Sequence, residues 1–353
     1  MRNYEHGGDV FAEEKRPIDF SVNINPLGMP AAAVEAAQKA VAEELSYPDP
    51  FCRRLTAALA KRYKVAEESI ICGNGASDLM MRLCSYAQPE KVLVPAPGFS
   101  EYERCAQLMG ADVAEFSVLG EQSPMESLLS KAVQYSPDMI FICRPNNPDG
   151  SMLRFEEVKK LAGFCQRRGI VLVCDECFLE FTQEKSVAEL TEKYKKLVVI
   201  NAFTKTYAMA GLRLGFMICS DQDLLDGTYA CGSPWSVSAP AQAAAEVCCA
   251  ETDFLEKSRQ YIDEQRKKLV SGLEKLGLRV FPSQANFLLV REPQGFTEAS
   301  EERTALREKL AQRSIKVRDC RTFTGLDDSY IRIGVRTEEE NNALLKALED
   351  IYG

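Results

Sequence analysis

One stretch decides the fold and chemistry of this chain: Asn201-Ala-Phe-Thr-Lys-Thr-Tyr-Ala-Met-Ala-Gly-Leu-Arg213. It follows an apolar, strand-like run, Leu197-Val-Val-Ile200, and places Lys205 in a turn of small residues. Because a lysine in such a turn can be desolvated, its pKa falls and its amine becomes a nucleophile. Arg213 offers a planar fork for a phosphate. The alternative is a surface lysine and a helical arginine, and three further segments decide between the two interpretations.

The first segment is Val171-Leu-Val-Cys-Asp-Glu-Cys-Phe178, an apolar strand that ends in acidic residues. A carboxylate at the end of a buried parallel strand points into the crevice where such sheets bind ligands, so Asp175 is a candidate site residue. A fixed carboxylate is the recurring partner of the pyridinium nitrogen of pyridoxal phosphate, because it keeps the ring protonated as an electron sink. The alternative role of Asp175 is to cap the next element.

The other two segments are turns. Asp138-Met-Ile-Phe-Ile-Cys-Arg-Pro-Asn-Asn-Pro-Asp-Gly150 runs from a strand into a Pro/Asn/Gly turn, where Asn147 can donate its amide to the ring oxygen of the cofactor; taken alone, it favours a simple turn. Ile70-Ile-Cys-Gly-Asn-Gly-Ala-Ser-Asp78 is a glycine-rich turn that opens a helix, where backbone N–H groups and the helix dipole favour an anion. In this order, the segments predict pyridoxal phosphate held as a Schiff base.

Together these motifs resemble the fold-type I pyridoxal phosphate enzymes, in the branch of the histidinol-phosphate aminotransferases, over nearly the whole chain. The resemblance implies an α/β fold, with a mostly parallel central sheet in a large domain and a smaller α+β C-terminal domain. Within that branch, three stretches are similar to the threonine-phosphate decarboxylases of the cobalamin pathway: His6-Gly-Gly8, Asp19-Phe-Ser-Val-Asn-Ile-Asn-Pro-Leu-Gly-Met-Pro30 and Ser233-Pro-Trp-Ser-Val-Ser238. The second has Ile between its two Asn, where the aminotransferases usually carry Glu, and the third has Trp where they usually carry Phe.

The resemblance assigns the cofactor site residue by residue. Lys205 is the Schiff-base lysine and proton carrier, Asp175 pairs with the pyridine nitrogen, and Asn147 contacts the ring hydroxyl. Phe99 stacks on the ring face, and Phe178 stands where many aminotransferases have a Tyr that serves the ring oxygen. The cofactor phosphate is held by the backbone of Gly75 and Ala76, by Ser77, Thr204 and Arg213, and by Tyr47 from the neighbouring subunit.

The resemblance also implies a substrate site and a partner. Arg332 would bind the substrate carboxylate, and Arg318 the substrate phosphate, helped by Asn23 and His6. Because Tyr47 and the N-terminal arm would serve a second subunit, a homodimer with shared active sites is expected. The partners are then a small phosphorylated amino acid and a second copy of the chain.

The function so implied is decarboxylation of O-phospho-L-threonine to (R)-1-aminopropan-2-ol O-phosphate for the cobalamin side chain. Two enzymatic alternatives stay open: an aminotransferase acting on histidinol phosphate or another amino acid, and a decarboxylase of O-phospho-L-serine, which lacks one methyl group. A single methyl in an apolar pocket gives only about 1–3 kcal/mol of discrimination. A non-enzymatic ligand-binding module on the same fold is a further alternative, which the presence of Lys205, Asp175 and Arg213 disfavours.

Two positions in the Asn turn depart from the family pattern. Asp149 stands where the family usually has Thr, and Arg144 replaces a small residue before the turn. We expect either an ion pair between these two side chains across the turn or a change in the contacts to the substrate. Phe178 also departs from the pattern, and the loss of a hydroxyl there favours the decarboxylase over ordinary transamination.

Composition limits the remaining functions. The chain has 353 residues, of which 46% are hydrophobic and 27% charged, as in soluble globular proteins. The net charge of −9 argues against a nucleic-acid partner, which needs a basic face. No run of apolar residues is long enough to cross a membrane, and the start has no apolar signal core, so a cytoplasmic location is expected. The 13 Cys residues are then expected to be reduced. Cys174 and Cys177 form a C-x-x-C motif, but the chain has only one His and no second Cys pair at the spacing of a zinc site, so no metal site is expected.

The order of predicted elements divides the chain into an N-terminal arm (1–28), a large cofactor-binding domain (29–250) and a small C-terminal domain (251–353). Alternating strands and helices predict a parallel sheet covered on both faces. The predicted strands are 91–94, 139–143, 170–174, 197–200 and 214–218, with 285–290 and 330–334 in the small domain. The predicted helices are 31–45, 51–63, 252–276, which would bridge the domains, and 338–351.

Overall fold

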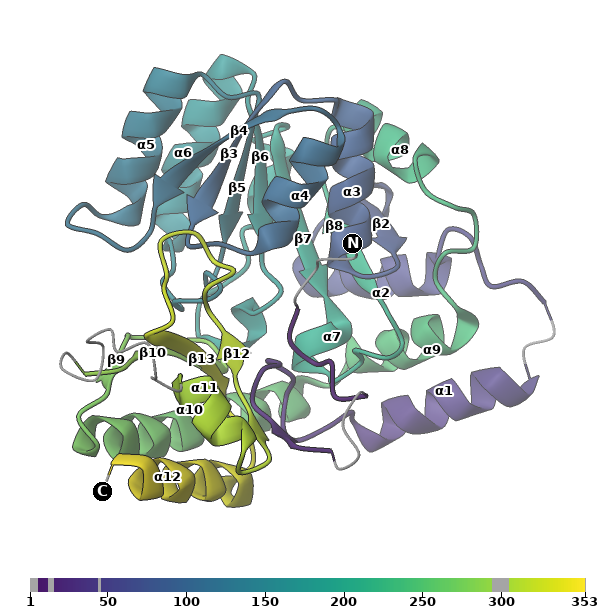
Figure 1. Cartoon of the computed structure of the whole chain (residues 1–353). Helices are drawn as coiled ribbons and strands as arrows, with labels where there is room; N and C mark the ends of the chain where they lie inside the picture. Colours follow the sequence, from purple (N-terminus) through teal and green to yellow (C-terminus); the bar gives the residue numbers. More distant parts are fainter. Residues whose placement is uncertain (1–5, 12–15, 44–45, 294–304, 353) are drawn as a thin grey trace.

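The computed structural model describes residues 6–11, 16–43, 46–293 and 305–352, and its centre is a seven-stranded sheet (Figure 1). The strand order is β2-β8-β7-β6-β5-β3-β4. Only β8 runs antiparallel to its neighbours, so the expected mostly parallel sheet is confirmed. The strands are β2 (Ile70–Gly73), β3 (Lys91–Ala96), β4 (Asp112–Ser117), β5 (Met139–Cys143), β6 (Val171–Asp175), β7 (Leu197–Ala202) and β8 (Gly215–Ile218).

Helices cover both faces of this sheet, which explains why its inner strands β5, β6 and β7 are apolar except near their carboxyl ends, at Asp175 and Asn201. Along β5, for example, Ile140 and Ile142 belong to one group of buried side chains, and Phe141 and Cys143 to the other. One face packs on α1 (Ala31–Glu43), α2 (Arg53–Tyr63), α5 (Pro124–Tyr135), α6 (Phe155–Arg168) and α9 (Ala239–Cys248). The other packs on α3 (Ala76–Ala87), α4 (Ser100–Leu108) and α8 (Gln222–Ala230). The short helices are η1 (Glu67–Ser69), η2 (Leu179–Phe181), η3 (Ala188–Glu192) and α7 (Phe203–Thr206).

A second, four-stranded sheet lies beside the first, in the order β12-β13-β10-β9, with α10 and α12 packed against it (Figure 1). Helix α10 joins the two parts of the molecule, because its Leu255 lies in the core of the large sheet and its Ile262, Leu269 and Leu273 in the core of the small one. The elements are α10 (Thr252–Lys275), β9 (Arg279–Val280), β10 (Phe287–Arg291), α11 (Leu306–Ala311), β12 (Arg318–Asp319), β13 (Tyr330–Gly334) and α12 (Glu338–Tyr352).

The N-terminal segment is tied to the small sheet region by a two-residue strand that the sequence did not reveal. Strand β1 (Ile18–Asp19) pairs in parallel with β11 (Ile315–Lys316). Further along, the Asn25 backbone N–H donates to the carbonyl of Lys205 at 3.0 Å, and its side-chain amide donates to the Thr206 carbonyl at 2.8 Å. The segment therefore connects the small sheet to helix α7, which carries the predicted catalytic lysine.

Where predicted and observed boundaries differ, local backbone chemistry explains the shift. Helix α2 begins at Arg53 rather than Phe51, because Cys52 has φ 49° and cannot continue a helix toward its N-terminus. Strand β6 begins at Val171 and not at Ile170. The Ile170 N–H follows the Gly169 cap of α6 and donates to the Cys165 carbonyl, so it does not pair with a neighbouring strand. The predicted end of the first helix at Leu45 lies outside the described residues. No helix in the described part of the chain is both long and apolar enough to span a bilayer.

Candidate active site

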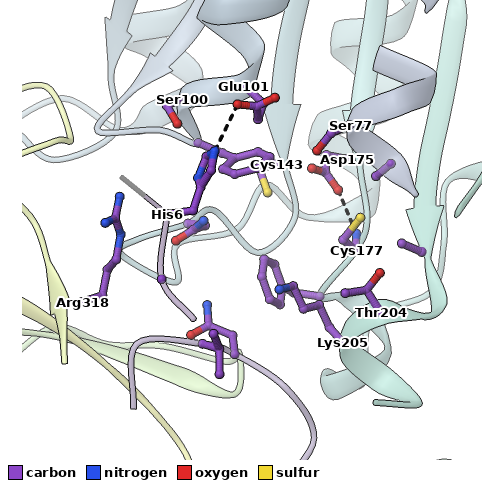
Figure 2. A pocket seen from close by; sticks show the side chains of 18 of the residues that line it. His6, Ser77, Ser100, Glu101, Cys143, Asp175, Cys177, Thr204, Lys205 and Arg318 are labelled. Carbon is purple, nitrogen blue, oxygen red and sulfur yellow. Dashed lines mark hydrogen bonds and ion pairs between the residues drawn. The ribbon is translucent and has the colours of Figure 1, made fainter. Parts of the chain in front are cut away.

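The predicted site residues meet in a cavity of about 280 Å³ beyond the carboxyl ends of β5, β6 and β7 (Figure 2). Parallel strands place ligand sites at this edge. The structure brings thirteen of the fifteen predicted residues to the cavity wall: His6, Asn23, Ala76, Ser77, Phe99, Asn147, Asp175, Phe178, Thr204, Lys205, Arg213, Arg318 and Arg332. Gly75 lies directly behind Arg213, and Tyr47 lies elsewhere on the surface.

Lys205 stands on α7, directly after β7, and its side chain is partly buried at the cavity. Desolvation, together with the positive charges of Arg332 and Arg213, lowers the pKa of its ammonium group to about 8, against the opposing effect of Asp175. At pH 7 roughly a tenth of such an amine is neutral, compared with less than about one in a thousand for an ordinary lysine. The site therefore supplies a nucleophilic amine near neutral pH, as the turn sequence predicted.

We expect the cofactor-free protein to capture pyridoxal phosphate faster as the pH rises, with a midpoint near the pKa of about 8 of Lys205. The sign follows from the neutral amine being the reactive form, and its fraction grows through that pKa. Stopped-flow absorbance between pH 6 and 9.5 measures this rate. A rate that still climbs steeply above pH 9.5 would show that the Lys205 ammonium group is not desolvated.

Asp175 ends β6 with its carboxylate buried and held at both oxygens. The Tyr102 hydroxyl donates to Oδ2 at 2.7 Å, and the Cys177 backbone N–H donates to Oδ1 at 2.9 Å. Burial raises the pKa of the Asp175 carboxyl, and these two hydrogen bonds and the charge of Lys205 oppose that rise. A cationic N–H in the cavity would complete the charge balance of this carboxylate, which is the part a pyridinium ring plays.

Another part of the cavity wall is suited to an anion. Helix α3 starts at Ala76, so its first N–H groups and positive dipole end face the cavity, next to the hydroxyls of Ser77 and Thr204. Gly75 has φ 90°, and a Cβ there would lie 2.7 Å from Arg213 Nη2. Glycine is therefore favoured by the backbone conformation, and a larger residue would also displace the Arg213 guanidinium group.

The middle of the cavity lies between aromatic side chains. Phe99 precedes α4, and its ring meets Tyr102 edge-on with centroids 5.5 Å apart. Phe178 is buried and packs edge-on against Phe287 at 5.0 Å, so it contributes an apolar wall and no hydroxyl. The Asn147 Oδ1 accepts a short hydrogen bond from Arg332 Nη1.

Two buried arginines of the small sheet complete the cavity. Arg332 on β13 donates from Nη2 to the Ser21 carbonyl at 2.7 Å, and burial and the nearby charge of Arg318 lower the pKa of its guanidinium to about 10. Arg318 on β12 donates from Nη2 to Thr322 Oγ1 at 2.8 Å and lies over the Phe323 ring. Because arginine side chains carry a positive charge in proteins, two guanidinium groups on this side of the cavity favour ligands with more than one negative charge. Asn23 is buried beside them.

The expected ion pair between Arg144 and Asp149 is wrong. Arg144 instead donates from Nη1 to Glu176 Oε1 at 2.6 Å, and from Nε to the Leu153 carbonyl. Asp149 accepts from Asn146 Nδ2 at 2.6 Å, which fixes the turn. Neither Arg144 nor Asp149 is among the described residues that line the cavity.

Several cavity residues were missed by the sequence reasoning. Tyr102 could have been found, because it lies one helical turn beyond Phe99 and thus on the same face of α4. Ser21 and Glu101 carry no local signal, since their roles depend on contacts with Gly8 and His6 from the N-terminal segment. The other missed lining residues are Gly7, Val22, Ser100, Cys143, Cys177, Ala202, Thr322 and Phe323.

Comparison with known proteins gives the family. The chain matches the model of the aminotransferase class I and II family over residues 15–348, and it belongs to this family. It is 29% identical to the threonine-phosphate decarboxylase of Salmonella typhimurium, covering 99% of this chain and 97% of that protein. It is 30% identical to the histidinol-phosphate aminotransferase of Symbiobacterium thermophilum, covering 95% and 91%. The solved histidinol-phosphate aminotransferase of Clostridium acetobutylicum superposes with a TM-score of 0.86 at 30% identity, covering 95% and 99%.

The cofactor of this family, and of this chain, is pyridoxal 5'-phosphate. The cavity fits it in three ways: a carboxylate held at both oxygens, an anion cradle formed by the start of α3 with Thr204 and Arg213, and a lysine of lowered pKa. The fold and the cofactor expected from the sequence are thus confirmed.

Proposed function

We propose that this protein decarboxylates O-phospho-L-threonine to (R)-1-aminopropan-2-ol O-phosphate, the phosphorylated amino alcohol used in cobalamin side-chain synthesis. The observation that carries the proposal is the pair of buried arginines, Arg332 and Arg318, in one cavity with the cofactor residues. A substrate with a carboxylate and a phosphate matches both positive charges at once. The name of the Salmonella relative, threonine-phosphate decarboxylase, refers to a substrate of this kind.

Each group of the chain has a proposed task. Bound pyridoxal phosphate supplies an electron sink for a bond broken at the substrate Cα. Arg332, held by Asn147 and Ser21, fixes the substrate carboxylate, and Arg318 fixes its phosphate. Lys205 then delivers a proton to the carbon that has lost CO₂, which balances the reaction as loss of CO₂ and gain of H⁺.

Transamination is the competing function, because the same residues serve it. The two reactions differ in which bond at Cα the protein aligns for cleavage, and a misplacement of about 1 Å can change rates roughly a hundredfold. The apolar Phe178 wall favours decarboxylation, since the ring oxygen there receives no tyrosine hydroxyl. The relative from Symbiobacterium keeps histidinol phosphate as a second candidate substrate.

Product analysis decides between these functions. The loaded protein would be incubated with O-phospho-L-threonine, with O-phospho-L-serine, or with histidinol phosphate and 2-oxoglutarate. Release of CO₂ with a phosphorylated amino alcohol supports the proposal and names the substrate. Glutamate formation without CO₂ would establish an aminotransferase instead. As a site control, Arg318→Met should raise KM for the phosphorylated substrate roughly ten- to a hundredfold, while Arg321→Met, an exposed neighbour paired with Asp319, should not.

We also propose a homodimer with shared active sites. Tyr47 is 77% exposed and stacks on Trp235, with ring centroids 4.6 Å apart. Phe51, Val41 and Leu27 are further exposed apolar side chains in or near α1, and we propose that a second copy of the chain covers them.

Co-expression of two inactive or impaired variants tests this arrangement. A Tyr47→Ala chain keeps Lys205, and a Lys205→Ala chain keeps Tyr47, so a mixed dimer has one intact site only if Tyr47 serves the neighbouring subunit. We expect the mixture to recover wild-type KM and tight cofactor binding in a fraction of its sites. Recovery of neither, or a single-chain mass of the active protein in gel filtration, would exclude sharing.

A further inference from the structure

We propose that Glu101 is a positioning residue, which acts through His6 to hold the N-terminal segment over the substrate side of the cavity. His6 Nε2 lies 3.3 Å from Glu101 Oε1, and the contact joins the start of the chain to the first turn of α4 (Figure 2). No sequence motif pointed to Glu101. The role of the contact in catalysis depends on the function proposed above.

Glu101 is well suited to this task because its carboxylate is buried and charged. The residue is 5% exposed, and burial by itself raises the pKa of its carboxyl, yet hydrogen bonds from His6 and Arg104 outweigh burial and bring that pKa below its ordinary value. Arg104, three residues on, holds both oxygens with its Nε at 3.0 and 3.1 Å. The carboxylate is therefore fixed from its own helix and presents a stationary acceptor to His6.

The segment that carries His6 is shaped to fit against the substrate residues. A Cβ at Gly7 would lie 2.2 Å from the Ser21 carbonyl oxygen, and Gly8 has φ 92°, so both positions require glycine. The Gly8 N–H donates to Ser21 Oγ at 2.9 Å, and the Ser21 carbonyl accepts from Arg332. The His6-Gly-Gly8 motif thus packs directly on the residue that holds the carboxylate-binding arginine.

The contact also sets what His6 can offer a ligand. With Nε2 directed at Glu101, only the rest of the ring can meet a ligand, and His6 stands on the side of the cavity where Arg318 lies, away from Lys205 and Thr204 (Figure 2). A phosphate bound to Arg318 would meet the imidazole from the other side. Without Glu101 the half-exposed ring would lose its fixed orientation, and substrate binding would weaken more than the chemical step.

A double-mutant cycle tests this coupling. We expect Glu101→Gln and His6→Ala each to raise KM for O-phospho-L-threonine roughly three- to tenfold with little change in kcat, and Glu101→Gln to add nothing in the His6→Ala background. Glu103→Gln is the matched control, since Glu103 is on the same helix and pairs with Gln107. Independent, multiplicative effects of the two changes, or an equal effect of Glu103→Gln, would overturn the proposal.

A readout that needs neither cofactor nor substrate separates this proposal from the proposed function. The chain has one histidine, so a histidine-labelled sample gives a single imidazole spin system. The His6 imidazole resonances should shift in Glu101→Gln and stay in place in Glu103→Gln. If they do not shift, the positioning role is wrong even if phosphothreonine is decarboxylated; if they shift and phosphothreonine is not turned over, the contact stands and the proposed substrate fails.

Discussion

Replacing Lys205 with alanine is expected to reduce turnover by at least roughly 10³-fold, whatever the substrate. On the proposed assignment the amine would both anchor the cofactor and carry the proton, and acid–base catalysis alone contributes about 10²–10⁴-fold. No other lysine is among the described residues that line the cavity. The absorbance band of the wild-type protein loaded with cofactor, lost on borohydride treatment, should be missing in the variant. Full activity in the variant would refute the assignment of Lys205.

The same substitution should not weaken the fold. Lys205 lies near the positive charges of Arg332 and Arg213, which lower the pKa of its ammonium group, so its removal relieves electrostatic repulsion. We expect an unchanged or slightly higher melting temperature of the cofactor-free variant. Lys61→Ala on the exposed face of α2 is a suitable control, with unchanged activity and stability. A large loss of stability in Lys205→Ala would make its inactivity uninformative.

Replacing Arg144 with methionine is expected to destabilise the cofactor-free fold by about 3–5 kcal/mol, the largest effect on stability that we predict. Arg144 and Glu176 form a fully buried ion pair, and losing one partner leaves the other charge uncompensated inside the protein. Glu176 also accepts from the Val187 N–H at 3.0 Å, and burial already raises the pKa of its carboxyl. Thermal and urea unfolding of the cofactor-free protein measure the change.

Two further variants show whether the buried charge is the cause. Arg154→Met removes an exposed arginine that pairs with Glu184. It should change the free energy of unfolding by less than about 0.5 kcal/mol. Glu176→Gln in the Arg144→Met background should recover part of the loss, because the amide is neutral and can still accept from Val187. If the double variant is less stable than Arg144→Met, the loss comes from packing instead of from an unpaired charge.

The cofactor half of the site was predictable from sequence because its residues follow local rules. Strand ends, a glycine-rich helix start and a lysine turn each carry their own pattern, and a parallel sheet brings such ends together at one edge. Asp175, Asn147, Lys205 and Arg213 accordingly all reach the cavity. The ion pair considered between Arg144 and Asp149 is not formed, because closeness within a turn does not show which other partners a side chain can reach. Arg144 instead pairs with Glu176, which follows the end of the neighbouring strand.

The sequence by itself determined the fold class and the cofactor, and it pointed to Lys205 as the lysine proposed to hold it, because alternating apolar strands and turn motifs are encoded over short distances. The tertiary structure alone decided how the substrate side is assembled. Arg332 and Arg318 come from the second sheet, Ser21 and His6 from the N-terminal segment, and Glu101 from the start of α4. The hydrogen bond from Arg332 to Ser21, for example, joins residues 311 positions apart, and only packing of the two sheets brings these groups into one cavity.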